Sequence, residues 1–149
     1  MKKMNTQVTT KIKINKPANL VFEAFVSPSK IGNFWFSSSS ERWEKGKRIT
    51  LRYDEYNAEG VINVLEIEDN KRIVFSWGEE HGEETVVSII LKEDDTSTII
   101  EVNESGLKEE DPEIVAKMIG QKEGWVYTLT CLKGYLENEV NNLRASLIH

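Results

Sequence analysis

The sequence contains one cysteine, two histidines and no long hydrophobic run. A single cysteine excludes an intramolecular disulfide framework and any zinc site built on several cysteines. With only His81 and His149 available, a metal centre built on several histidines is excluded too, so we expect neither a metal nor another cofactor. The sequence also lacks a phosphate-binding glycine loop, a nucleophile elbow and the ligand spacing of a calcium-binding loop.

Positive charge is in the minority, with 19 lysines and arginines against 25 aspartates and glutamates, a formal net charge of -6. Nucleic acids and anionic lipids are bound by basic faces, so this balance argues against both as partners. The first residues lack the apolar segment of a secretory signal, and no apolar stretch reaches the length of a membrane span, so membrane insertion is not expected. We therefore expect a cytoplasmic protein with a single domain over residues 1–149.

Short alternating segments dominate the first two thirds of the chain. Residues 8–14 alternate apolar and polar side chains with a period of two, which predicts a half-buried strand. Pro17 precedes a helical pattern, and Ser27-Pro28 predicts a second, short helix that ends near Phe34. Further strands are predicted at Trp43 and over 48–53, 61–67, 72–77, 85–91 and 98–102. Tight turns between them predict an antiparallel meander.

The last third of the chain changes to helical spacing. Asp111-Pro112 is typical of a helix start, with a capping carboxylate followed by proline at the first position. Apolar residues then recur at spacings of three, four or seven, which predicts one helix from Asp111 to about Leu147. Because most helix stability comes from tertiary burial, such a helix needs a broad surface to cover. We therefore predict an α+β fold with helices on one face of an antiparallel sheet.

Large side chains at the gap between sheet and helix are candidates for a ligand pocket. Tryptophan and tyrosine combine an apolar body with one polar group, and methionine adds an adaptable thioether, which suits a partly apolar ligand. The candidate lining residues are Trp35, Phe36, Trp43, Tyr53, Trp77, Met118, Trp125 and Leu129. Each tryptophan can instead be core. Gly120 and Gly124 indicate either space for a ligand or, as we favour, close approach of the helix to a neighbouring element.

Few residues are candidates for chemistry. His81 lies among acidic residues in an expected solvated turn. Glu66 and Glu101 are the carboxylates that could act as acid or base in a pocket, although most carboxylates in such strands are solvated. Arg48 and Arg52 are expected to face solvent, whereas an arginine turned inward could hold a ligand carboxylate through two hydrogen bonds.

Several motifs, by their order and spacing, resemble those of the SRPBCC or START-like superfamily, and within it the proteins named after the activator of Hsp90 ATPase homologue 1. The motifs are Pro17-Ala18 with Val21-Phe22, Trp35-Phe36, Trp43, Gly46, the segments 72–77 and 97–106, and Gly124-Trp125 with Leu129, Leu132, Tyr135 and Leu136. The resemblance covers nearly the whole chain. It implies a helix-grip fold, in which an antiparallel sheet curves around a long C-terminal helix and leaves a hydrophobic cavity between them. That family shares no catalytic set, so no catalytic residue is carried over.

Three functions are compatible with these observations. The leading hypothesis is binding of a small apolar or amphipathic molecule, such as a lipid, in the cavity. One alternative is a cyclase- or hydrolase-like enzyme, which would need a carboxylate or histidine facing the cavity. The other is a co-chaperone or stress-response protein that contacts an Hsp90-type chaperone, which would need an exposed apolar patch elsewhere. We expect a lone domain without the additional N-terminal domain of the eukaryotic co-chaperone, which argues against this role. A homodimer is compatible with the sequence, which does not determine the oligomeric state.

Overall fold

The computed structural model describes residues 5–79 and 82–148. Within them, seven antiparallel strands form one sheet in the order β1-β7-β6-β5-β4-β3-β2. The strands are β1 (Val8–Ile14), β2 (Ser38–Ser39), β3 (Arg48–Tyr53), β4 (Ala58–Glu68), β5 (Arg72–Trp77), β6 (Thr85–Asp94) and β7 (Ser97–Ser105). The helices are α1 (Ala18–Val26) and α2 (Ile114–Asn138). The predicted meander is confirmed, because each strand from β2 to β6 pairs with the next along the chain, and β1 pairs with β7.

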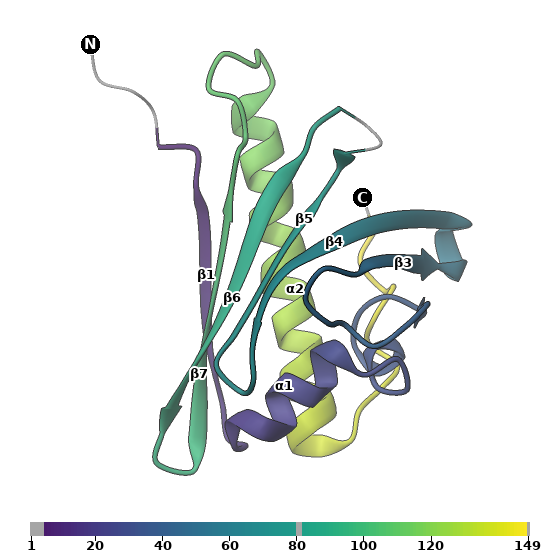
Figure 1. Ribbon diagram of the computed structural model, residues 1–149, viewed down its shortest axis with the longest axis vertical. Helices are drawn as coiled ribbons and strands as arrows, with labels where there is room; N and C mark the ends of the chain where they lie inside the picture. Colours follow the sequence, from purple (N-terminus) through teal and green to yellow (C-terminus); the bar gives the residue numbers. More distant parts are fainter. Residues whose placement is uncertain (1–4, 80–81, 149) are drawn as a thin grey trace.

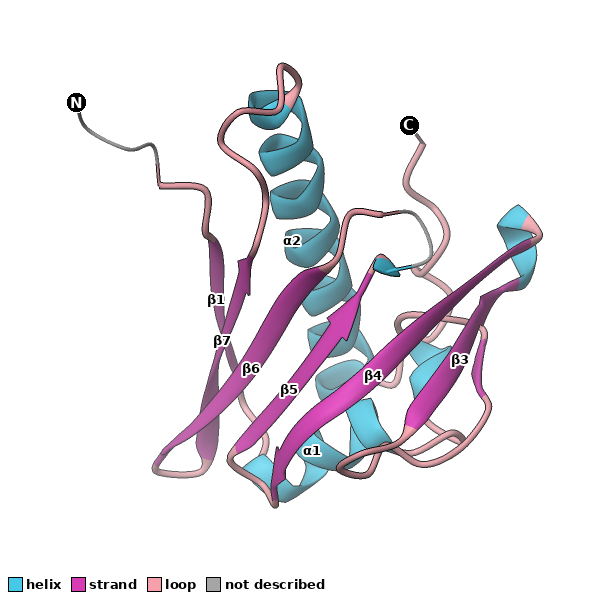
Figure 2. Cartoon of the chain, turned by 45° about the horizontal axis from the view of Figure 1, so that its top comes forward, coloured by secondary structure: helices cyan, strands magenta, loops and turns pink. Residues whose placement is uncertain are grey.

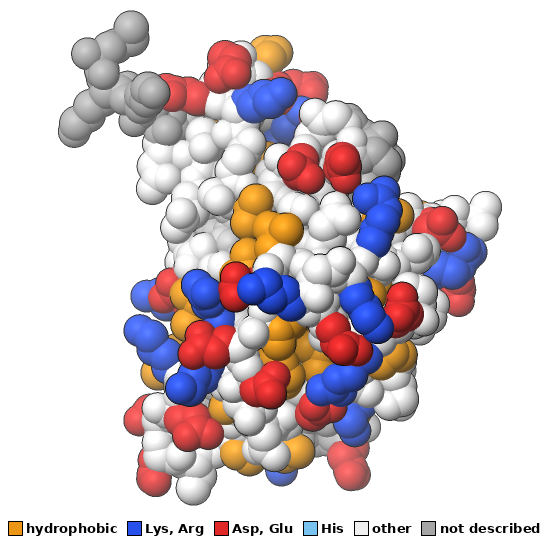
Figure 3. All heavy atoms as spheres, viewed as in Figure 1, with side chains coloured by type: hydrophobic (Ala, Val, Ile, Leu, Met, Phe, Trp, Pro, Cys, Tyr) orange, Lys and Arg blue, Asp and Glu red, His pale blue; other side chains and the backbone are white. Residues whose placement is uncertain are grey.

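Both helices lie on the same face of the sheet. Figure 1 shows α2 running along the inner face of the curved sheet, with α1 crossing near the C-terminal end of α2. Figure 2 shows that the strands twist progressively from β1 to β3, so that the sheet bends around the helix. This arrangement confirms the predicted α+β fold of helix-grip type. On the outer face of the sheet, positively and negatively charged side chains lie interspersed around hydrophobic ones (Figure 3).

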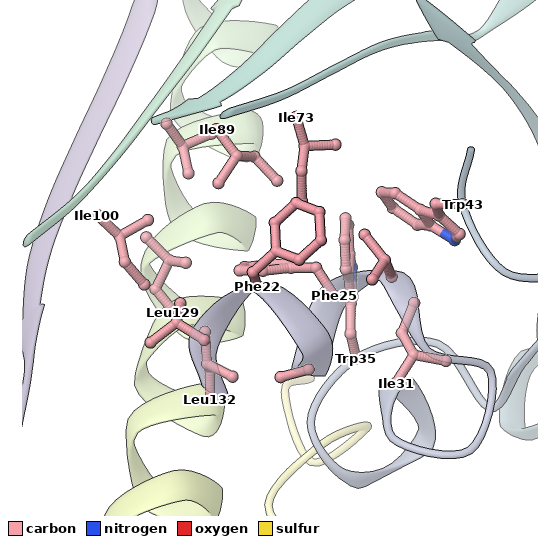
Figure 4. Close-up of a cluster of buried hydrophobic side chains, with 14 of the residues drawn as sticks. Phe22, Phe25, Ile31, Trp35, Trp43, Ile73, Ile89, Ile100, Leu129 and Leu132 are labelled. Carbon is pink, nitrogen blue, oxygen red and sulfur yellow. The ribbon is translucent and has the colours of Figure 1, made fainter. Parts of the chain in front are cut away.

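Strand alternation directs one side chain in two toward the helices. Ile73 and Phe75 of β5 are fully buried, and they meet Phe25 of α1 and Leu129 of α2 in one hydrophobic core. Figure 4 shows side chains from the sheet and from both helices converging there. A bulge in β4 between Val64 and Glu66 interrupts the pairing with β5. Bulges bend the strand that carries them, so this one adds to the curvature of the sheet.

The segment between α1 and β3 differs from the prediction. The second helix is only a 3-10 turn over Ile31–Asn33, and Trp43 lies in a loop instead of a strand. A side chain at Gly32 would come within 2.8 Å of the Ser37 carbonyl oxygen, so the chain doubles back too tightly for a longer helix. The Trp43 ring packs against Phe75 in the core, with 5.3 Å between ring centroids.

The prediction that the last helix continues to about Leu147 is wrong. The helix ends at Asn138, and Glu139 adopts the left-handed conformation, with φ of 56°, that commonly ends helices. Residues 139–148, here called the C-terminal segment, then fold back along the helix (Figure 1). A Cβ atom at Gly134 would lie 3.3 Å from Leu143, so the glycine permits this close return. At the other end, Asp111 precedes the helix by a turn and accepts a hydrogen bond from the Glu113 backbone N–H at 2.8 Å.

We expect Leu129→Ala to lower the free energy of unfolding by about 3 kcal/mol, because the fully buried leucine would leave a cavity between α2 and the sheet. Urea denaturation followed by circular dichroism measures this loss. Leu65→Ala is the matched control, since Leu65 is 43% exposed beside the β4 bulge, and it should cost less than about 1 kcal/mol. Equal losses in the two variants would contradict the packing of α2 described here.

Candidate functional site

A groove runs along α2 between the helix and the β3–β5 side of the sheet. Its largest part is a cavity of about 420 Å³ lined by Phe36, Leu51, Gly60, Val61, Ile62, Trp77, Gly78, Glu83, Thr85, Glu104, Leu107, Lys117, Gly120 and Gln121. A smaller recess adjoins it, sharing Phe36, Trp77 and Gln121. That recess in turn shares Tyr53, Gly124 and Thr128 with a third hollow beneath the C-terminal segment. The three spaces therefore follow one side of the helix.

Five of the eight side chains predicted to line a pocket gather around this groove. They are Trp35, Phe36, Tyr53, Trp77 and Trp125. The ring centroids of Trp35 and Trp77 lie 5.2 and 5.6 Å from that of Trp125, and those of Phe36 and Tyr53 lie 4.9 Å apart. Their rings form a continuous aromatic wall from the cavity to the adjoining recess. Short elements far apart in sequence thus build one apolar surface.

The other three predicted residues lie elsewhere. Trp43 and Leu129 are buried in the core, where they contact other side chains instead of the groove. Figure 4 shows both among the core residues. Met118 lies on a different side of α2, in a shallow surface hollow beside residues 7–9. Helical spacing explains the difference, because Met118 is one residue away from Lys117 and therefore points about 100° around the helix from it.

Gly120 and Gly124 lie where the helix borders the groove. A Cβ atom built on either glycine would meet no atom within 4 Å outside the helix's own nearby backbone. The favoured interpretation, close approach of the helix to a neighbouring element, is therefore wrong for both residues. Glycine inside a helix costs about 1 kcal/mol relative to alanine. Since no clash requires it at these positions, the two glycines lower helix stability and leave the groove open.

Glu104 is the charged group at the inner wall of the cavity, and the sequence analysis did not single it out. Its side chain comes from β7 and is buried, with 1% exposed. One oxygen accepts hydrogen bonds from Trp125 Nε1 and Gln121 Nε2, both at 2.9 Å. The other accepts from Trp77 Nε1 at 2.9 Å, Thr85 Oγ1 at 2.5 Å and Gln121 Nε2 at 3.0 Å. Both tryptophans of the aromatic wall are thus held by one carboxylate.

The two carboxylates that the sequence did suggest face solvent. Glu66 lies 3.5 Å from Lys45 Nζ at the surface. Glu101 accepts a hydrogen bond from Asn103, which lowers the pKa of the carboxyl group, and forms an ion pair with Lys11. Alternation along β7 could have found the inward-facing carboxylate, because Ile100, Val102 and Glu104 share one face of the strand. His81 lies outside the described residues.

The rim of the cavity carries a lysine between two carboxylates. Lys117 on α2 forms ion pairs with Asp111 at 2.5 Å and with Glu83, which precedes β6. These two partners, Asp111 first, raise the pKa of the Lys117 ammonium above its ordinary value. The same contact lowers the pKa of Asp111. The lysine is therefore protonated, and its charge is matched within the protein.

Arg144 anchors the C-terminal segment at the far end of the groove. Its guanidinium donates to the Trp35 carbonyl oxygen at 2.5 Å and to Glu55 at 2.5 and 3.0 Å. It also lies 5.3 Å from the centre of the Tyr53 ring, and only 9% of its side chain is exposed. The hydrogen bonds from Arg144 lower the pKa of Glu55 to about 2. The contacts hold the segment over the aromatic wall.

The arginines that the sequence singled out do not approach the groove. Arg48 and Arg52 are exposed, as expected, and form ion pairs with Glu79 and Glu59. Arg144, whose side chain is 9% exposed, does reach the groove, and the sequence analysis placed it inside a helix. Within residues 5–79 and 82–148, no group of three histidine, cysteine or acidic side chains is arranged to hold a metal ion. No helix in those ranges is long and apolar enough to cross a bilayer.

Comparison with known proteins gives one family and several similar structures. The family model for the Activator of Hsp90 ATPase homolog 1-like protein matches residues 15–137. The crystal structure of SSP2350 from Staphylococcus saprophyticus is 48% identical with a TM-score of 0.80, over 91% of this chain and 94% of that chain. The solution structure of the Aha1 dimer from Colwellia psychrerythraea is 18% identical with a TM-score of 0.76, over 89% and 96%.

A further similar structure, at low identity, comes from another bacterium. CalU16 from Micromonospora echinospora is 17% identical with a TM-score of 0.73, over 93% of this chain and 83% of that chain. At such identities the likeness to CalU16 and to the Aha1 dimer shows the fold alone. No curated protein matches the chain.

We expect Arg144→Gln to lower the free energy of unfolding by about 1 kcal/mol at neutral pH, because it removes charged hydrogen bonds from a largely buried side chain. It should also speed amide hydrogen exchange in residues 140–148. Arg52→Gln is the matched control at an exposed ion pair, with an expected cost below about 0.5 kcal/mol. Indistinguishable exchange in the two variants would show that Arg144 does not anchor the segment.

The difference in free energy of unfolding between wild type and Arg144→Gln should shrink as the pH is lowered. The pKa of Glu55 in the folded protein is about 2, below its ordinary value of 4.5, so the folded state favours the ionised form. The Glu55 contribution to stability is therefore complete above pH 4.5 and is lost as the pH falls toward 2. Urea denaturation across this range should show the two stabilities converging. A constant difference would contradict the role of the ion pair.

Proposed function

The chain belongs to the Activator of Hsp90 ATPase homolog 1-like protein family, in the SRPBCC superfamily, and we propose that it binds a small apolar or amphipathic molecule in the groove beside α2. The observation that carries the proposal is the open space that Gly120 and Gly124 leave against the aromatic wall. A volume of about 420 Å³ lies within the range of small-molecule sites. Glycine at positions 120 and 124 lowers the stability of α2, and a ligand that occupies the space beside them would explain why glycine is present.

Glu104 bears on the choice between binding and catalysis. An enzyme of this fold needs an acid or base in the cavity, and Glu104 is a carboxylate that lines it. A carboxylate has about four lone-pair sites, however, and this one already accepts hydrogen bonds from four side chains. Those contacts leave no free lone pair to take a proton from a substrate. The arrangement favours a role for Glu104 in shaping a binding site.

The proposal is tested by substitutions on α2 that place larger side chains in the groove. We expect the neutral dye N-phenyl-1-naphthylamine to bind wild-type protein, with enhanced dye fluorescence and quenched tryptophan emission. Gly120→Leu and Gly124→Leu should each weaken binding at least about tenfold, because the new side chains would occupy the space that the ligand needs. Both variants should fold, since leucine favours a helix more than glycine does.

Ala116→Leu is the matched control, because Ala116 is exposed on the same helix and does not line the groove. Its affinity for the dye should equal that of wild type. Binding that survives both glycine substitutions, or no dye binding to wild type, would overturn the proposal.

A second candidate function is self-association through the exposed side of α2. Val115, Ile119 and Val126 are 57%, 62% and 47% exposed, and their spacing of four and seven residues places them on one side of the helix. An exposed apolar stripe of this kind is typical of a protein contact. We propose a second copy of the chain as the partner, an interpretation that the solution structure of the Aha1 dimer from Colwellia psychrerythraea supports.

Light scattering coupled to size-exclusion chromatography tests the dimer. Wild type should elute with twice the chain mass of 17.1 kDa, and Ile119→Lys should elute as a monomer, because a buried charge at the contact would be unfavourable. Val86→Lys, at another exposed apolar position on β6, should leave the mass unchanged. A monomeric wild type over the accessible concentration range would rule this candidate out.

A further inference from the structure

We infer that the ligand of this groove carries a cationic group, a protonated amine or a quaternary ammonium, which lies against the aromatic wall beside Glu104. The inference rests on the proposed function and adds the chemical class of the ligand. It follows from three properties of the cavity: a buried carboxylate whose hydrogen-bond donors are all neutral, a lysine whose charge is already matched, and indole rings fixed by that carboxylate.

The charge of Glu104 has no counter-ion in the described part of the chain. Each of its hydrogen-bond donors is neutral: two indoles, a hydroxyl and an amide. No lysine or arginine among the described residues forms an ion pair with it, and its neighbours across β7 are Val8 and Val87. Neutral hydrogen bonds offset part of the cost of burying a carboxylate, but buried charges in proteins are normally paired. A cation in the cavity would supply the missing charge.

Lys117 does not supply it. Its ammonium forms ion pairs with Asp111 and Glu83, which lie at the rim on either side of it. The charged side chains that line the cavity are Glu83, Glu104 and Lys117, so the lining itself has an excess of negative charge. An anionic ligand would meet this excess directly. The field in the cavity therefore favours positively charged ligands over neutral ones and disfavours anions.

The aromatic wall suits the same ligand. Trp77 and Trp125 both donate their indole N–H to Glu104 at 2.9 Å, which fixes the position of two rings that line the groove. The face of an aromatic ring attracts cations, and tryptophan does so most strongly. An indole that donates to a carboxylate is polarised toward greater electron density on the ring. The carboxylate and the aromatic rings therefore both attract a cationic group of the ligand.

The experiment compares three probes that share a naphthalene ring, by isothermal titration calorimetry at neutral pH. They are 2-(aminomethyl)naphthalene, which is cationic, 2-(hydroxymethyl)naphthalene, which is neutral, and 2-naphthoate, which is anionic. Wild type should bind the amine about tenfold more tightly than the alcohol, and the carboxylate most weakly. This ranking needs no variant, so it tests the inference even if changes at the buried carboxylate destabilise the protein.

Glu104→Gln then tests the source of the preference. The variant keeps the size of the side chain and removes its charge, so the advantage of the amine over the alcohol should fall to less than about twofold. The alcohol should bind the variant and wild type alike. Glu101→Gln is the matched control on the same strand, because Glu101 does not line the cavity and forms an ion pair with Lys11, so the preference for the amine should persist.

The outcomes separate this inference from the proposal on which it rests. If the alcohol or the carboxylate binds wild type as tightly as the amine, the cationic ligand is ruled out while the groove remains a binding site. An amine preference that persists unchanged in folded Glu104→Gln also overturns it. If none of the three probes nor N-phenyl-1-naphthylamine binds, both fail.

Discussion

One buried carboxylate joins the parts of this protein that form the groove. Glu104 of β7 accepts hydrogen bonds from Trp77 of β5, Thr85 of β6, and Gln121 and Trp125 of α2. These contacts connect three strands of the sheet to α2 beside the cavity. An unpaired donor or acceptor at such a depth would be costly, so each member depends on the others for its position. The aromatic wall is therefore held by polar contacts as well as by packing.

The two ends of α2 differ in how tightly they pack. Toward its C-terminus the helix is buried against α1 and the sheet through Leu129 and Leu132, and the C-terminal segment returns over it as far as Arg144. Toward its N-terminus Gly120 leaves space, and Lys117 connects the helix to the rim only through ion pairs. A closely packed half of the helix therefore adjoins a half that borders open space. Such a division suits a protein that holds a ligand without rebuilding its core.

The meander and the long helix could be predicted because their periodicities are local. Alternation over residues 8–14 and 72–77 marked β1 and β5 closely. The helix end could not be predicted in the same way, because Leu143 and Leu147 continue the apolar spacing while packing from a segment that has reversed direction. Arg144 was missed for that reason. Glu104 was missed because its sequence position resembles that of any strand carboxylate, although its register with Val102 placed it inward.

The antiparallel meander, the presence of one long C-terminal helix and the aromatic residues available to a groove were determined by the sequence itself, since side-chain periodicity and residue type are local properties. Only the tertiary structure decided which aromatic rings border open space, which carboxylate is buried and where the chain turns back. Those outcomes depend on contacts between residues far apart in the chain, such as Trp35 with Arg144 and Glu104 with Trp125. Spacing along one segment carries no information on what another segment places against it.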